Sequence, residues 1–309
     1  MRGDMDDITL SVIVPVYNEE EGLEPCIGHL AGVLEAGGES YEIILVDDGS
    51  SDRTPEIAEQ MCSRDKRVKL IGLSRNFGHQ AAITAGMELC TGNCVVVIDS
   101  DMQDPPELIP EMVRIWREGF DVVYGLRKRR LGETALKKLT ASVFYRVLGA
   151  ITEIDIPRDT GDFRLLDRKV CEAMKALPER GRYVRGLVSW VGFRQTALEY
   201  VRHERKVGKT KYNLKKMLRL AGNGLLSFSK VPLTAPLGIG AVVSLAALAA
   251  LIVMLCLPVF YSWAAAVSIV TFFIGIGISC IGIVGCYLGR VLDQAQGRPE
   301  YIIARKINI

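Results

Sequence analysis

Short apolar runs alternate with amphipathic segments along the first part of the chain. The runs are rich in β-branched and aliphatic residues and predict strands at residues 10–16, 41–46, 68–72, 94–98 and 121–125. The segments between and after them have the spacing of helices, at about residues 20–34, 54–62, 80–90, 106–116 and 136–148. This alternation predicts an α/β fold: a mostly parallel sheet with helices on both faces and ligands at the carboxyl ends of its strands.

The C-terminal part of the chain has a different pattern. No Asp, Glu, Lys or Arg occurs between Lys230 and Arg290, a stretch of 59 residues. A membrane helix needs roughly 20–25 residues, so this stretch predicts two transmembrane helices that turn near Pro258. Because positive residues precede and follow the hairpin, the positive-inside rule places both termini in the cytosol. The pattern therefore predicts a multi-pass protein of the cytoplasmic (inner) membrane, in contact with the lipid bilayer.

A basic segment precedes the apolar stretch and is hidden by the net charge of +2. From Val201 to Lys230 there are nine Lys or Arg residues and one acid, Glu204. Apolar positions at spacings of three and four from Asn213 predict an amphipathic helix, either at the membrane interface or on the surface of the preceding domain. Its position favours anionic lipid or a lipid phosphate over nucleic acid as the partner. We therefore expect a cytosolic domain at 1–212, the amphipathic helix at 213–230, the transmembrane hairpin at 231–289 and a cytosolic tail at 290–309.

Acidic residues directly follow the strand at 94–98. Asp99, Asp101 and Gln103 offer hard oxygen ligands at the sheet edge where ligands are expected, and this chemistry suits Mg²⁺ or Mn²⁺ bridging a diphosphate. Solvated acids are common in turns, so the Asp-x-Asp tripeptide at 99–101 is by itself weak evidence for a metal site. The eight cysteines are scattered without the spacing of a zinc site, and we interpret them as reduced.

Two further strand ends offer polar groups that suit a nucleotide. Asp47 and Asp48 follow the second strand, and Pro15, Tyr17 and Glu19 lie at the end of the first. Helix capping explains part of such a turn, but adjacent acids repel each other unless a cation or hydrogen bonds compensate. The first turn lacks the G-x-G-x-x-G of a dinucleotide site. Arg127, after the strand at 121–125, could help to neutralise a diphosphate.

These residues resemble those of polyprenyl-phosphate glycosyltransferases of family 2, the group of dolichyl-phosphate mannose synthase and bactoprenol glucosyltransferase. The resemblance covers the chain in order. It is carried by VIVPVYNEE at 12–20, VDDGS at 46–50, SRNFGH at 74–79, DSDMQDPP at 99–106, GDFR at 161–164, R-x-x-R-x-x-G-x-T-K-Y at 202–212 and the two expected spans. The resemblance implies a GT-A, Rossmann-like domain.

The resemblance also implies roles for individual residues. Asp99, Asp101 and Gln103 match the family's D-x-D-x-Q motif, which faces the metal and the diphosphate. The strand-end residues already named match its nucleotide-binding positions, and Arg127 matches a basic residue near the diphosphate. By the same analogy, Asp162 lies near the reacting centre. The residues implied to bind the acceptor phosphate are Arg202, Arg205, Lys211, Lys138 and Ser142, with a lysine at 138 where the family has an arginine.

The implied reaction moves one hexose from a nucleotide diphosphate sugar to a polyprenyl phosphate. Attack in line with the leaving group would invert the anomeric centre. UDP-glucose and GDP-mannose both fit the acidic turns, and a homo-oligomer is left open. One alternative is a processive polysaccharide synthase, but only Arg185 and Trp190 stand where its Q-x-x-R-W motif is expected, wrongly spaced. The other alternative is a catalytically silent membrane scaffold.

Overall fold

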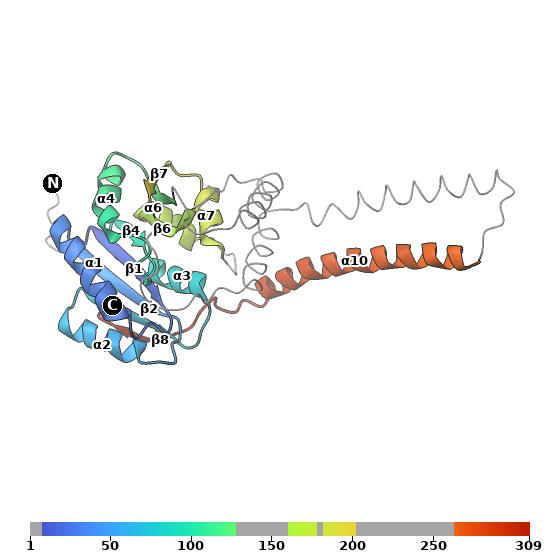
Figure 1. Cartoon of the computed structure of the whole chain (residues 1–309), viewed down its shortest axis with the longest axis horizontal. Helices are drawn as coiled ribbons and strands as arrows, with labels where there is room; N and C mark the ends of the chain where they lie inside the picture. Colours follow the sequence, from blue (N-terminus) through green and yellow to red (C-terminus); the bar gives the residue numbers. More distant parts are fainter. Residues whose placement is uncertain (1–7, 128–159, 178–181, 202–262) are drawn as a thin grey trace. The chain divides into compact units, whose positions relative to one another are not determined.

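The computed structural model describes residues 8–127, 160–177, 182–201 and 263–309 (Figure 1). These residues belong to two compact units. The first unit contains the described residues up to 201 together with 299–309, and the second contains 263–298. Three predicted segments lie outside the described ranges: the helices at 136–148 and 213–230, and the first part of the apolar stretch, residues 231–262. Their predicted structures stay predictions.

A mixed sheet forms the centre of the first unit. Its predicted strands are confirmed with small shifts in their ends: β1 (Leu10–Val16), β2 (Tyr41–Asp47), β3 (Val68–Leu73), β4 (Cys94–Val97) and β5 (Val122–Arg127). Three further strands were not predicted: β6 (Thr160–Asp167), β7 (Gln195–Tyr200) and β8 (Ile303–Ile307). The strand order is β7-β5-β6-β4-β1-β2-β3-β8.

The sheet is mostly parallel, as predicted, but two strands run against the rest. In the described part of the chain β1 pairs in parallel with β2 and β4, β2 with β3, and β5 with β7. β6 is antiparallel to both of its neighbours, and β8 is antiparallel to β3 at the edge. β8 comes from the C-terminal segment, residues 299–309, so the last residues of the chain complete the same sheet as the first ones.

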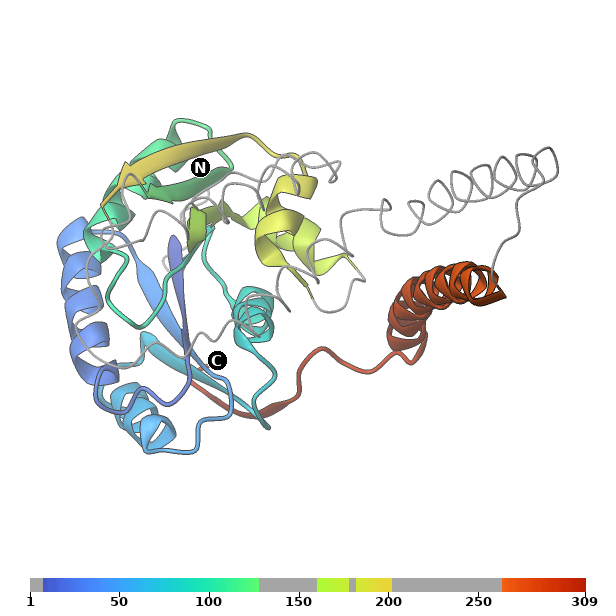
Figure 2. The same cartoon turned by 45° about the vertical axis from the view of Figure 1, so that its right-hand side comes forward.

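Helices cover both faces of the sheet. They are α1 (Leu23–Gly37), α2 (Thr54–Arg64), α3 (His79–Leu89), η1 (Pro106–Leu108), α4 (Ile109–Arg117), α6 (Arg168–Lys175) and α7 (Val184–Trp190). Alternate residues of β1, such as Val12 and Val14, pack with Leu30 of α1 and Met112 of α4 in the main core. The blue helices α1 and α2 lie on one side of the sheet, and α3 lies on the other (Figure 2).

The second unit contains a single long helix in its described residues, α10 (Trp263–Ala295). Crossing a membrane takes about 20 consecutive, predominantly apolar residues in one helix. No helix in the described part of the chain is both long enough and apolar enough to do so. This finding contradicts the prediction of a multi-pass protein of the cytoplasmic membrane.

A buried ion pair lies at the amino ends of the strands. The Glu42 carboxylate accepts hydrogen bonds from the Ser11 hydroxyl at 2.5 Å and the Thr91 amide at 2.7 Å, and it pairs with the Lys69 ammonium at 2.5 Å. Burial opposes ionisation, yet the bonds to Lys69, Ser11 and Thr91 lower the pKa of Glu42. The pair therefore stabilises the fold while Glu42 is ionised.

We expect Glu42→Gln to lower the free energy of unfolding at pH 7 by about 2–3 kcal/mol, because charge-assisted bonds in a buried site are lost. Since the folded pKa lies below the usual 4.5, this contribution is present above that pH and is lost as the pH falls further. Urea unfolding of both proteins at pH 7 and at acid pH measures the difference. The matched control is Glu35→Gln, because the Glu35 carboxylate pairs with Arg67 at the surface. If the difference in the free energy of unfolding between wild type and Glu42→Gln did not shrink in acid, ionised Glu42 would not be the source of the stabilisation.

Candidate active site

The loops after β1 and β2 are joined by hydrogen bonds at the carboxyl ends of the strands. The backbone N–H of Asn18 donates to the Ser50 hydroxyl at 2.9 Å, and the backbone N–H of Glu19 donates to the Thr54 hydroxyl at 2.8 Å. Asn18 has a positive φ of 52°, which turns the chain sharply after β1. Tyr17 is 38% exposed beside these bonds. The loops therefore present Tyr17 and Glu19 at the edge where the nucleotide site was predicted.

Asp47 and Asp48 are buried in this edge, and each has a local partner. The Asp47 carboxylate accepts from the Ser50 amide at 3.0 Å. The Asp48 carboxylate accepts from the amides of Phe77 and Gly78 at 2.7 and 2.9 Å, directly before α3. Burial raises the pKa of Asp48 against the effect of these amides. Asp48 thus fixes the start of α3, and its predicted contact with a nucleotide stays a prediction.

His79, the first residue of α3, lies between two carboxylates from different strands. Its Nε2 is 3.4 Å from Asp99 Oδ1 and 3.3 Å from Asp162 Oδ2. Asp99 follows β4, and Asp162 lies in β6, the antiparallel neighbour of β4. Apart from this ion-pair contact with His79, the buried Asp99 Oδ1 has no hydrogen-bond partner among the described residues. The structure therefore brings Asp99 and Asp162 together, and the residue between them is one to which the sequence analysis gave no role.

Arg185 of α7 binds both carboxylate oxygens of Asp162. Its Nε donates to Asp162 Oδ1 at 2.8 Å, and its Nη2 donates to Oδ2 at 3.1 Å. A third bond runs from Arg185 Nη1 to the Thr160 carbonyl at 3.2 Å. The planar guanidinium matches the carboxylate with two bonds, a geometry that lysine cannot reproduce. Asp162 is only 6% exposed, so this clamp fixes a buried carboxylate.

The charges in this group are coupled. Burial raises the pKa of Asp99 to about 6, and the carboxylates of Asp162, Asp104 and Asp101 act in the same direction against His79. Burial opposes the charge of His79, but Asp162 and Asp99 together raise the pKa of its imidazole to about 9. Burial also disfavours ionised Asp162, yet Arg185 and His79 hold the pKa of that carboxyl well below its usual range. At neutral pH Asp99 and Asp162 are therefore mostly ionised and His79 is protonated, so two carboxylates face two cations, His79 and Arg185.

Arg127 belongs to a neighbouring polar group. It is the last residue of β5 rather than a residue beyond the strand, and its Nε donates to the Tyr200 hydroxyl at 3.1 Å. Its Nη2 lies 3.6 Å from Asp104 Oδ1, and the Tyr200 hydroxyl also bonds Asp104. A Cβ at position 161 would collide with the Arg127 guanidinium, so the glycine there makes room for it. Arg127 is therefore held by internal partners in this structure.

The remaining predicted site residues differ in what the structure shows. The backbone N–H of Gln103 donates to Asp101 Oδ1 at 3.2 Å, and Met102 between them has a positive φ of 55°, so the D-x-D-x-Q segment forms a tight turn after β4. Pro15 is buried in β1 opposite Val46. The residues predicted to bind the acceptor phosphate lie outside the described ranges: Lys138, Ser142, Arg202, Arg205 and Lys211.

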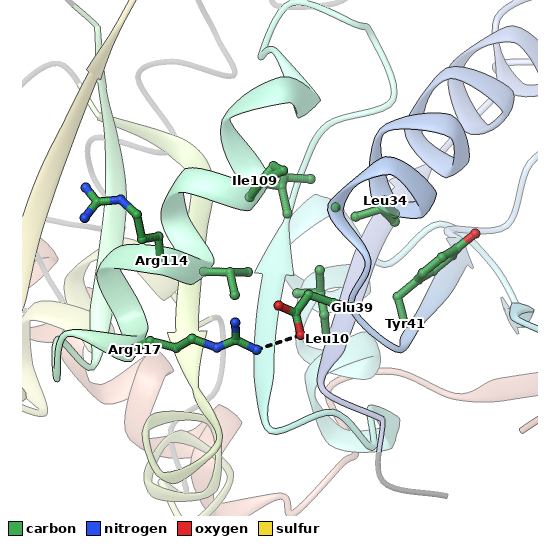
Figure 3. A pocket seen from close by; sticks show the side chains of 10 residues that line it. Leu10, Leu34, Glu39, Tyr41, Ile109, Arg114 and Arg117 are labelled. Carbon is green, nitrogen blue, oxygen red and sulfur yellow. Dashed lines mark hydrogen bonds and ion pairs between the residues drawn. The ribbon is translucent and has the colours of Figure 1, made fainter. Parts of the chain in front are cut away.

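A pocket of about 250 Å³ lies at the opposite edge of the sheet (Figure 3). Leu10, Leu34 and Ile109 contribute apolar side chains to its lining. Its Arg117 pairs with Glu39 at 2.7 Å, as the dashed line in Figure 3 shows. Its Arg114 pairs with Glu111 of the same helix and with Glu118, the residue directly after the helix. This pocket is at the amino ends of the strands, away from Asp99, and its arginines are already neutralised. It is not the candidate active site.

Sequence reasoning missed His79 and Arg185. The sequence does contain a signal for His79, because it follows the carboxyl end of β3, as the candidate acids follow β1, β2 and β4. Arg185 had no such signal. It lies on a short helix, 23 residues beyond Asp162, and only the folded chain brings the two together.

Comparison with known proteins places the chain in a family. The sequence model of "Glycosyl transferase family 2" matches residues 11–174, and the chain belongs to this family. It is 50% identical over 307 residues to "Uncharacterized glycosyltransferase YkcC" of Bacillus subtilis (strain 168), covering 98% of this chain and 95% of the relative. It is 36% identical over 301 residues to "Bactoprenol glucosyl transferase" of Shigella phage SfII, covering 96% of this chain and 97% of the relative.

These relatives confirm the resemblance to polyprenyl-phosphate glycosyltransferases, and the chain is a glycosyltransferase with a GT-A-like α/β fold. Among solved structures, the mannosyltransferase PcManGT from Pyrobaculum calidifontis, in complex with GDP-Man and Mn²⁺, has a TM-score of 0.49 at 18% identity. The match covers 90% of this chain and 88% of that one.

Proposed function

We propose that this chain transfers a single hexose from a nucleotide diphosphate sugar to a polyprenyl phosphate, with inversion at the anomeric carbon. The observation that carries the proposal is the group formed by Asp99, His79, Asp162 and Arg185 at the carboxyl ends of the strands. The relatives named bactoprenol glucosyl transferase support the lipid acceptor. A single-sugar donor of the UDP-glucose or GDP-mannose type suits the nucleotide edge formed by Tyr17, Glu19 and Asp47.

We further propose that Asp99, Asp101 and Gln103 hold a divalent cation, Mg²⁺ or Mn²⁺. The described residues contain no group of three or more His, Cys, Asp or Glu side chains able to hold a metal ion. Mg²⁺ in nucleotide sites is commonly bound by one or two carboxylates, with substrate phosphates and water completing the coordination, so two aspartates suffice. The buried Oδ1 of Asp99, which has no hydrogen-bond partner in the described part of the chain, fits this role. Such a cation supplies charge neutralisation for the leaving diphosphate.

The protein side chains then have limited acid–base work to do. A phosphate oxygen of the acceptor is already anionic, so the attacking group needs no proton removed. Asp162 is a poor base because Arg185 and His79 keep its pKa low. We propose that Asp162 orients His79 and, through it, Asp99, and that rate enhancement comes from bringing two anionic substrates together beside neutralising charge.

The test is a transfer assay with a panel of labelled sugar nucleotides and polyprenyl phosphate in detergent. We expect label from one donor to enter the lipid fraction, and the product to have the opposite anomeric configuration to the donor. Treatment with a chelator is expected to abolish transfer, and Mg²⁺ or Mn²⁺ to restore it. Full activity after chelation would overturn the metal assignment. A retained anomeric configuration would overturn direct displacement, and absence of lipid label with every donor would overturn the proposed function.

A further inference from the structure

The start of α7 is held by contacts from three parts of the first unit. The Arg182 guanidinium donates to the Leu177 carbonyl at 2.7 Å, and the Val184 amide donates to Gln80 Oε1 of α3 at 3.0 Å. The third contact comes from the C-terminal segment. Glu300 accepts from the Arg182 amide at 3.2 Å and lies 3.4 Å from Arg182 Nε.

The Arg182–Glu300 pair is well shielded from water. The Arg182 side chain is 9% exposed and that of Glu300 is 17% exposed, whereas surface pairs such as Arg64–Glu24 are more than half exposed on both sides. A shielded pair with two separate contacts constrains the backbone more than a surface ion pair does. Glu300 therefore restrains both the main chain and the side chain of Arg182, immediately before α7 begins.

Arg185 is the second residue of α7, and it clamps Asp162 with two bonds. The clamp depends on the position of α7, because both bonds come from one planar group. A displacement of α7 by a fraction of an ångström would lengthen both bonds and loosen Asp162 against His79. The physical connection runs from Glu300 through Arg182 and α7 to the buried carboxylate.

We propose that Glu300 is a positioning residue of the active site: it fixes the start of α7 through Arg182, so that Arg185 keeps Asp162 in place beside His79. This inference rests on the proposed sugar transfer for its kinetic readout. It gives the C-terminal segment a role in the reaction in addition to its role as the edge strand of the sheet.

The C-terminal segment also offers a matched control. Arg305 of β8 forms an ion pair with Glu59 of α2, far along the segment from α7. Glu59→Gln removes a tether of the same segment without touching α7. Glu300→Gln removes the tether at α7 and keeps the size of the side chain. A purely structural role for the segment predicts the same outcome for both variants.

We expect Glu300→Gln to lower kcat about three- to tenfold while the KM for the sugar donor changes little, because orientation and not donor binding is impaired. Glu300→Asp, which keeps the charge, should lose less, and Glu59→Gln should retain wild-type kcat. In an Arg185→Lys background, Glu300→Gln should add little further loss, since both changes act on the same carboxylate. Additive losses in this double-mutant cycle, or equal kcat for Glu300→Gln and the wild type, would overturn the inference.

Hydrogen exchange supplies a readout that does not depend on catalysis. We expect faster exchange in the peptide that covers α7 in Glu300→Gln, and no change there in Glu59→Gln. Unchanged exchange in α7 would overturn the inference even if kcat fell. Failure of the wild-type chain to transfer any sugar would overturn the proposed function alone, and the exchange result would still decide whether Glu300 positions α7.

Discussion

Asp99→Asn is expected to lower kcat/KM for sugar transfer about 100- to 1000-fold, the range measured when one preorganised electrostatic group is removed from an active site. Asparagine keeps the shape of the side chain but removes the charge that faces both the proposed cation and His79. The loss should fall as the Mg²⁺ or Mn²⁺ concentration is raised, because a weakened cation site is filled by mass action. Initial rates across a metal titration measure both effects.

The control for this change is Asp65→Asn. Asp65 pairs with Arg67 before β3, at the amino end of the strands, so its loss should leave transfer and metal dependence unaltered. An Asp99→Asn protein with normal activity and the metal requirement of the wild type would show that Asp99 holds no cation. If no concentration of metal restored kcat/KM, the role of Asp99 would be to orient His79 and not to bind the metal.

The parallel half of the sheet could be predicted from the sequence because its strands are buried on both faces. β1, β2 and β4 consist almost wholly of buried residues, and such strands have continuous apolar sequences. The acidic turns were found for the same reason: once the strands are recognised, the residues after them must lie at one edge. Asp99 and Asp47 were placed correctly at this edge by that argument alone.

β6 was missed because its pattern is set by the active site. Thr160, Asp162 and Arg164 alternate with Gly161, Phe163 and Leu165, and all six are buried. Buried polar residues on one side of a strand are stable only where partners exist, here Arg185 and His79 for Asp162. Those partners are distant in the sequence, so no local pattern could reveal that the segment is a strand inside the sheet.

β8 was missed for a different reason. It has five residues, alternates partly buried and exposed positions, and follows α10 by only a few residues. Its place at the edge of the sheet depends on contacts with residues more than two hundred positions earlier, such as the bonds from the Asn308 side chain to the carbonyls of Cys62 and Val68. Pairing over such a sequence distance is a property of the folded chain. The contact between Arg182 and Glu300, which are 118 positions apart, could not be predicted for the same reason.

Arg185→Ala is expected to lower kcat about 100-fold, because it leaves the buried Asp162 carboxylate without its bidentate partner. The freed carboxylate would draw the His79 imidazole toward itself and away from Asp99, so the metal end of the network is disturbed as well. Free guanidinium should restore part of kcat by filling the space of the lost side chain. Steady-state kinetics with and without added guanidinium measure the rescue.

Arg117→Ala is the matched control, since Arg117 pairs with a carboxylate at the opposite edge of the sheet (Figure 3). Its kcat should equal that of the wild type and should not respond to guanidinium. If Arg185→Ala is too unstable to purify, Arg185→Lys keeps the charge while losing the second bond, and a kcat between those of wild type and alanine is expected. Full activity of the lysine variant would show that charge alone suffices. A loss in Arg185→Ala that guanidinium never restores, in a protein that melts at the wild-type temperature, would argue that Arg185 contacts substrate directly rather than positioning Asp162.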